Sequence, residues 1–309
     1  MSKKVFIIVV ATIVLLVSAP IIMVIVWDDE SITNSEEDTD IVKENAMEEN
    51  TVKENTVEES IVEENITEEN TVEEDLPYMP NGFSYVEGEV ETGYTIADSY
   101  GNTYVWVPVE NGELIRNIDI SECVEIENMV TDFKNSVNQY KGFYIAKYES
   151  SAYSINNKNV SATMGDRTPV NNVNYAIAYE TANNSYKEFN YSDVVTNLIN
   201  SYAWDTTLAW IDKSNSNYST STNRGNYSET INPTGATEAD IVNNICDLAG
   251  NLEEWTTEGY LINNDTVNQQ FFRIIRGGSV KFNGSALNRS YKEDGSDYNI
   301  GFRMILYKT

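Results

Sequence analysis

A short stretch near the C-terminal end, residues 243–257 with the sequence NNICDLAGNLEEWTT, combines residue types that could bind a cation. Carboxylates at Asp247 and Glu254 flank a turn centred on Gly250. Calcium takes oxygen ligands from carboxylates and backbone carbonyls, and a turn directs carbonyls inward. The alternative is that Asp247 caps the turn and Glu254 is a solvated charge. We favour a structural calcium site at this turn.

The amino-acid composition limits the metals, cofactors and partners that the chain could bind. The chain of 309 residues has no histidine, so the commonest general base and transition-metal ligand is absent. We expect calcium, and no haem, nucleotide or transition metal. The two cysteines, Cys123 and Cys246, are too few for a disulfide scaffold, and they either pair or stay buried as thiols. The net charge of −29 makes nucleic acid an unsuitable partner.

The N-terminus has the pattern of a membrane anchor. Residues 5–27 are apolar and uncharged, and ~20 such residues cross a bilayer as a helix. Lys3 and Lys4 precede this stretch and residues 28–30 are acidic, which places the N-terminus inside. A cleaved signal peptide is the alternative, but Pro20 follows the small-residue motif and should block cleavage. We predict a signal anchor over 1–27 in a single-pass protein of the cell membrane, with an extracellular C-terminal domain.

Residues 28–75 are predicted to be a disordered, acidic spacer. From Ile41 to Asp75 the chain repeats five-residue units such as IVKEN, TVKEN and IVEEN. Five residues advance a helix by ~500°, so the apolar positions form no stripe, and in a strand an odd period alternates faces. Like charges also repel and extend the run.

The remaining residues, 76–309, are predicted to form one extracellular α+β domain. Strands are expected at 94–98, 104–109 and 142–149, and helices at 130–137, 175–189 with Asn174 as N-cap, 192–200 and 203–212. A long polar loop is expected over 214–240. Trp106, Trp204, Trp210 and Trp255 are predicted core residues, and Arg276, Arg289 and Arg303 are predicted to pair with carboxylates.

From about Gly142 to Arg303 the chain resembles the formylglycine-generating enzyme and sulfatase-modifying factor family. The resemblance lies in five motifs in the family's order: FYIAKYE at 143–149, Pro169-Val170, DLAGNL with Glu254-Trp255, Arg276-Gly277-Gly278-Ser279, and Gly301-Phe302-Arg303. It implies a loop-rich variant of the C-type-lectin-like fold. It also implies calcium ligands at Asp247, Glu254 and the carbonyls of Gly250 and Leu252.

The catalytic groups of the family are missing from this sequence. The resemblance implies a pair of cysteines shortly after the Gly-Gly-Ser turn, but residues 280–287 read VKFNGSAL. Family members that use iron need histidines. We therefore assign no catalytic residue and expect a non-catalytic binding or display module, in which the scaffold is retained. The alternative is an enzyme of this family with altered chemistry, using carboxylates such as Glu253, Glu254 and Asp297.

Residues 281–299 depart most from the enzyme pattern. They are rich in Asn, Ser, Tyr, Asp and Gly, which make adaptable polar contacts together with rigid aromatic area. We predict that the ligand-facing residues are Lys281, Asn283, Asn288, Tyr291, Asp297 and Tyr298, and that the ligand is an extracellular glycan, peptide or protein. The alternative is an ordinary solvated loop. The abundance of Asn and Tyr suggests a bacterial source.

Overall fold

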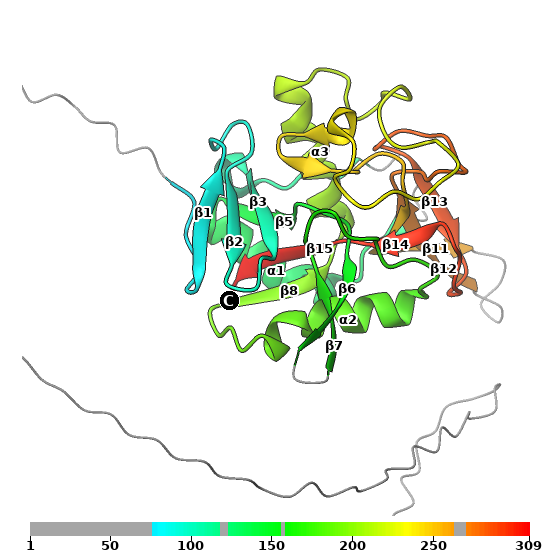
Figure 1. The fold of residues 1–309 in the computed structure, drawn as a ribbon. Helices are drawn as coiled ribbons and strands as arrows, with labels where there is room; N and C mark the ends of the chain where they lie inside the picture. The colour runs from blue at the N-terminus through cyan, green and yellow to red at the C-terminus, as the bar shows by residue number, and fades with distance from the viewer. Residues whose placement is uncertain (1–75, 118–122, 156–157, 263–269) are drawn as a thin grey trace, which may run out of the picture. The chain divides into compact units, whose positions relative to one another are not determined.

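The computed structural model describes residues 76–117, 123–155, 158–262 and 270–309. The predicted anchor and the predicted spacer lie outside these ranges. Within them, no helix is both long and apolar enough to cross a membrane. Figure 1 shows the described residues as a mixed arrangement of strands, helices and long connections.

The main sheet has six strands in the order β1-β2-β3-β5-β15-β8, and all neighbours are antiparallel. The strands are β1 (Phe83–Glu87), β2 (Thr95–Asp98), β3 (Thr103–Pro108), β5 (Gly142–Ala146), β8 (Val194–Leu198) and β15 (Met304–Lys308). The C-terminal strand β15 therefore lies inside the sheet, between β5 and β8. In Figure 1 it is the red arrow beside β8.

Each face of this sheet has its own hydrophobic core. On β15, Met304 and Leu306 face the core under helix α2 (Tyr175–Glu188), whereas Ile305 and Tyr307 face the core under α1 (Glu127–Tyr140) and α3 (Ser201–Ser214). This alternation follows from the two-residue period of a strand. The four tryptophans predicted to be buried, Trp106, Trp204, Trp210 and Trp255, all lie in these cores.

A second sheet carries the stretch on which the sequence analysis centres. Its strands are β13 (Arg289–Lys292), β12 (Gln270–Arg276), β11 (Glu253–Ile262) and β14 (Ile300–Phe302), with β4 (Cys123–Val124) also paired to β11. The smaller elements are β6 (Ser151–Ile155) with β7 (Lys158–Ala162), β9 (Ile241–Val242) with β10 (Ile245–Cys246), and the short helices η1 (Glu110–Gly112) and η2 (Glu238–Asp240). The chain from 215 to 237 forms no helix and no named strand, in line with the predicted loop.

Most predicted elements are confirmed. Helix α2 matches its expected range, and Asn174 caps it by accepting a hydrogen bond from the backbone N–H of Ile177 at 2.9 Å. The helix predicted at 192–200 is wrong, because β8 occupies this segment and pairs with β15 from Val194 to Leu198. Alternate residues of β8 are buried, so pairing at the sheet edge overrides the local preference.

Candidate functional site

The predicted cation-binding stretch forms a tight turn between β10 and β11. Asp247, Gly250 and Asn251 have positive φ angles of 55°, 77° and 56°. At Gly250 an added Cβ would come within 2.6 Å of the backbone of Asn226, so glycine is needed both for the conformation and for the close approach. The turn is buried, and its polar groups must find partners inside the protein.

Asp247 joins this turn to the long polar loop. Its Oδ2 accepts hydrogen bonds from the Thr234 hydroxyl and from the backbone N–H of Gly235, each at 2.8 Å. Burial raises the pKa of Asp247, and these two hydrogen bonds oppose the rise. The carboxylate therefore serves to fix the loop in place.

Glu254 forms a buried ion pair with Arg303. The Nε of Arg303 donates to both carboxylate oxygens at 3.1 Å, and one terminal nitrogen donates to Oε1 at 2.8 Å. The side chains are at most 1% exposed. Burial acts to lower the pKa of Arg303, but the neighbouring carboxylates, Glu254 first, raise it above its ordinary value. The guanidinium is therefore a fixed positive charge in the core.

The remaining donors of Arg303 reach backbone carbonyls. They bond to Ala146 at 2.9 Å, Lys147 at 3.2 Å, Cys246 at 2.8 Å and Asp247 at 3.3 Å. One side chain thus ties together the end of β5, the end of β10, the turn and the start of β11. A guanidinium here supplies the positive charge that a bound metal would supply.

The donor set does not fit a calcium ion held by Asp247 and Glu254 together. Both oxygens of Glu254 face Arg303, so binding calcium would require breaking that ion pair and leaving a buried cation beside the metal. In the described ranges, no three or more acidic, cysteine or histidine side chains are grouped so that they could hold a metal. The carbonyls of Gly250 and Leu252 lie in the same turn because the two residues are close in the chain. Their position is therefore no evidence for a calcium site.

Glu149 is a key residue of this turn that the sequence analysis did not assign. Its two oxygens accept from the backbone N–H of Leu252 at 3.1 Å and from Nδ2 of Asn251 at 2.5 Å. It is fully buried, and burial, then the charges of Asp247 and Glu254, raise its pKa well above the ordinary value. The signal in the sequence was the acidic residue at the end of the FYIAKYE motif, three residues after β5 ends at Ala146.

A second buried cluster of ion pairs contacts the backbone of the 281–289 segment. Arg276 bonds to Asp205 at 2.7 Å, and Arg289 bridges Asp205 and Glu258 at 3.0 Å each. Arg116 bonds to the other oxygen of Glu258 at 3.0 Å. The prediction that Arg276, Arg289 and Arg303 pair with carboxylates is confirmed.

This cluster anchors the segment that the sequence analysis proposed as a binding surface. Arg276 Nε donates to the carbonyl of Asn288 at 3.0 Å, and the indole N–H of Trp204 donates to the carbonyl of Ala286 at 2.9 Å. The hydroxyl of Tyr227, in the polar loop, donates to the carbonyl of Gly284 at 2.8 Å. The segment is therefore held by its backbone, which leaves several of its side chains available.

Two of the six predicted ligand-facing residues line one hollow, and a third lies close to one of them. Lys281 and Asn283 line a cavity of about 480 Å³ with Tyr227, Glu229 and Val280. The ammonium of Lys281 lies 5.9 Å from the centre of the Tyr298 ring, which is 59% exposed. Phe282, which was not among the predicted residues, is 57% exposed beside them.

The other three predicted residues lie apart from this hollow. Tyr291 is on β13, where its ring stacks on Tyr260 at 5.0 Å. Asp297 is bound to Lys292 and to the backbone N–H of Asn299. Asn288 is half-buried and its amide donates to Ser290. We therefore define the binding surface as Tyr227, Glu229, Lys281, Phe282, Asn283 and Tyr298.

Glu253 is a buried carboxylate whose charge is sensitive to pH near neutrality. It begins β11 and is 5% exposed. Burial raises its pKa to about 7, with Lys292 opposing the rise and Asp297 adding to it. Both of these residues belong to the 281–299 segment, so the charge of Glu253 is coupled to that segment.

The family of the chain is shown by its sequence. Residues 88–308 match the model of the sulfatase-modifying factor enzyme 1-like domain. The chain therefore belongs to this family, as the five motifs indicated. No curated protein matches the chain significantly.

Two solved structures resemble this one at low identity. The crystal structure of CarF has 15% identity and a TM-score of 0.38, covering 55% of this chain and 87% of CarF. Variable protein 1 of Treponema denticola has 14% identity and a TM-score of 0.40, covering 74% of this chain and 99% of that protein. The family membership rests on the sequence match and not on these superpositions.

The ion pair in the core can be tested by substitution. Arg303→Met leaves Glu254 buried without a counter-ion, and we expect a loss of about 3–5 kcal/mol in the free energy of unfolding. The double variant Arg303→Met with Glu254→Met should recover part of this loss, because Glu254 is no longer left as a buried charge, while the four backbone carbonyls that Arg303 bound stay without this donor. Urea unfolding followed by tryptophan fluorescence measures both.

Lys213→Met is the matched control, since the Lys213–Glu110 pair is exposed at 59% and 79%. It should leave the urea midpoint nearly unchanged because water screens such pairs. Equal losses in Arg303→Met and Lys213→Met would contradict the assigned role of the buried pair.

The raised pKa of Glu253 predicts how stability depends on pH. The stability that Glu253 contributes to the free energy of unfolding is fully present below its unfolded pKa, near 4.5. This stability is lost as pH rises through the folded pKa of about 7. Glu253→Gln should therefore unfold like wild type at low pH but be more stable at pH 8, by up to roughly 3 kcal/mol. The exposed variant Glu180→Gln is the control, and a wild-type pH profile in Glu253→Gln would refute the assignment.

Removal of calcium should have no effect on stability, because Arg303 already neutralises Glu254. We expect the same melting temperature in excess calcium and in chelator. The opposite result, a higher melting temperature in calcium that is lost in Asp247→Ala, would support the calcium site predicted from the sequence.

Proposed function

We propose that this protein is a membrane-anchored, extracellular binding module that uses a sulfatase-modifying-factor scaffold without its chemistry. The observation that supports the proposal is the binding surface. There Lys281 lines a hollow, Phe282 follows it in the chain and the exposed Tyr298 lies close to it. Arg276 of a buried ionic cluster binds the backbone of the same segment at Asn288. The apolar segment 5–27 and the acidic spacer would hold this module outside the membrane.

A protein or peptide is the ligand class that this surface favours. Phe282 and Tyr298 each expose more than half of their side chains, and aromatic residues are enriched at the centres of protein interfaces. Lys281 and Glu229 add charges of both signs next to the hollow, which would select partners by complementarity. Since the backbone is tied down, little conformational entropy would be lost on binding.

An enzyme of the same family with altered chemistry is the second candidate. It is favoured by Glu253, whose pKa of about 7 suits a general acid or base. Glu254 is unsuited to such a role because Arg303 holds both of its oxygens. Glu253 is itself buried, so a substrate could reach it only if the surrounding residues moved.

Binding can be tested with the full-length protein in a detergent without a sugar headgroup, on an array of cell-envelope and extracellular-matrix proteins, peptides and glycans. We expect binding to a protein or peptide that falls at least ~10-fold in Phe282→Ala and in Tyr298→Ala, the loss typical of interface anchors. Tyr291→Ala is the matched control, since it removes an equally exposed tyrosine outside the hollow.

Absence of binding to every protein and peptide, or equal loss in all three variants, would refute the proposed surface. Glu253→Gln should bind as wild type does. Turnover of an array ligand that is abolished in Glu253→Gln would instead support the enzyme.

A further inference from the structure

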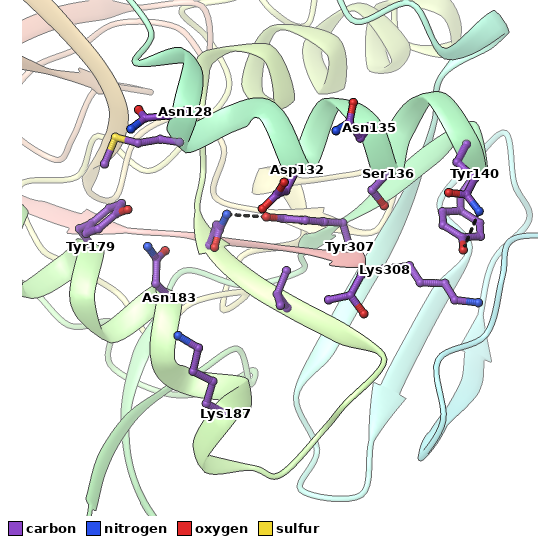
Figure 2. Close-up of a pocket in the computed structure, with 15 residues that line it drawn as sticks. Asn128, Asp132, Asn135, Ser136, Tyr140, Tyr179, Asn183, Lys187, Tyr307 and Lys308 are labelled. Carbon is purple, nitrogen blue, oxygen red and sulfur yellow. Dashed lines mark hydrogen bonds between the residues drawn. The ribbon is translucent and has the colours of Figure 1, made fainter.

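A second hollow, lined with polar side chains, lies at the far edge of the six-stranded sheet. Its volume is about 590 Å³, within the range of small-ligand sites. Residues of α1 and α2 form its walls, and Tyr307 of β15 lies between them (Figure 2). Asn197 of β8 also lines it. None of the residues in the binding surface of the previous subsection lines it.

Both walls follow helical spacing. Asn128, Asp132 and Ser136 on α1 are four residues apart, so they share one face of the helix. Tyr179, Asn183 and Lys187 do the same on α2. Figure 2 shows these two rows on opposite sides of the hollow, with Tyr307 between them. Polar residues are thus placed facing one another from separate elements.

One buried group in this hollow has no hydrogen-bond partner among the described residues. Ser136 is 6% exposed, and its buried hydroxyl makes no hydrogen bond to any described residue. Asp132 is exposed to solvent and lines the hollow. The Tyr307 oxygen accepts from Nδ2 of Asn197 at 2.7 Å, which fixes the ring and leaves the hydroxyl hydrogen to donate. A buried hydroxyl without a partner is costly unless something else satisfies it.

We propose that this hollow is a binding site for a neutral sugar unit of a glycan. Amide and hydroxyl side chains both donate and accept, as sugar hydroxyls do, and a carboxylate accepts from hydroxyl pairs. The ring of Tyr179 offers an aromatic face for the C–H side of a sugar. The hollow has charges of both signs, Asp132 on one wall and Lys187 and Lys308 among the other lining residues, and the carboxylate of Asp132 would repel a phosphate group.

An extended peptide is disfavoured because the edge of β8 is already covered. The backbone N–H of Leu198 donates to Oδ1 of Asn183 at 3.1 Å, and the hydroxyl of Thr196 donates to the carbonyl of Ala182 at 2.7 Å. Helix α2 therefore lies along the strand edge that a peptide would need for β-strand addition.

Saturation-transfer NMR tests the proposal on the full-length protein in a detergent without a sugar headgroup. The probes are the methyl glycosides of glucose, galactose, mannose and N-acetylglucosamine. We expect transfer to at least one glycoside, weakened roughly five- to tenfold in each of Ser136→Ala, Asp132→Ala and Asn128→Ala, the loss of one hydrogen bond. Asn138→Ala, on another face of α1, is the matched control and should bind as wild type does.

Ser136→Ala carries a second readout that separates binding from folding. Because its hydroxyl makes no hydrogen bond to a described residue, this variant should melt no lower than the wild type while binding more weakly. Phe282→Ala should leave the glycoside signal unchanged, so this test is independent of the proposed protein-binding surface. The proposal is overturned if no glycoside receives transfer, if Asn138→Ala weakens binding equally, or if a neutral tetraserine peptide receives transfer in place of the glycosides.

Discussion

The guanidinium of Arg303 is the constraint on which the rest of this structure depends. It is fully buried, pairs with Glu254 and donates to carbonyls of β5, β10 and the 247–252 turn. A buried charge is tolerated when its donors are all satisfied, and this arrangement uses segments more than a hundred residues apart to do so. The ends of the two sheets are therefore joined through one side chain.

In the second ionic cluster, buried charges paired with one another again hold separate segments together. Here they support the binding surface. Asp205 on α3 holds Arg276 and Arg289, and these residues border the segment whose side chains surround the hollow at Lys281. Because the backbone of the segment is fixed from beneath, its exposed side chains can vary without loss of the fold. Such a combination of a fixed backbone with exposed side chains suits a binding module.

The two hollows differ in their chemistry. The one at Lys281 exposes Phe282 and Tyr298 to solvent, and this combination suits the apolar centre of a protein interface. The one between α1 and α2 is lined with amide, hydroxyl and charged side chains together with Met129 and Val195, and it includes the unsatisfied hydroxyl of Ser136. A module with both would contact two kinds of ligand through separate elements.

Local sequence determined a large share of this protein. The motifs of 142–303 were enough to assign the family, and composition and short-range patterns gave the buried tryptophans, helix α2 with its Asn174 cap, and the glycines of the turns. These features depend on neighbours a few residues away, and so can be read from a single chain.

Tertiary structure alone decided which long-range partners meet. The sequence placed Glu254 near Asp247 but could not show that Arg303, 49 residues later, takes both of its oxygens. It predicted a helix at 192–200, where pairing with β15 makes the segment a strand, β8. It also left Glu149 and Ser136 unassigned. The physical reason is that burial and partner choice are set by segments far apart in the chain, which no local pattern records.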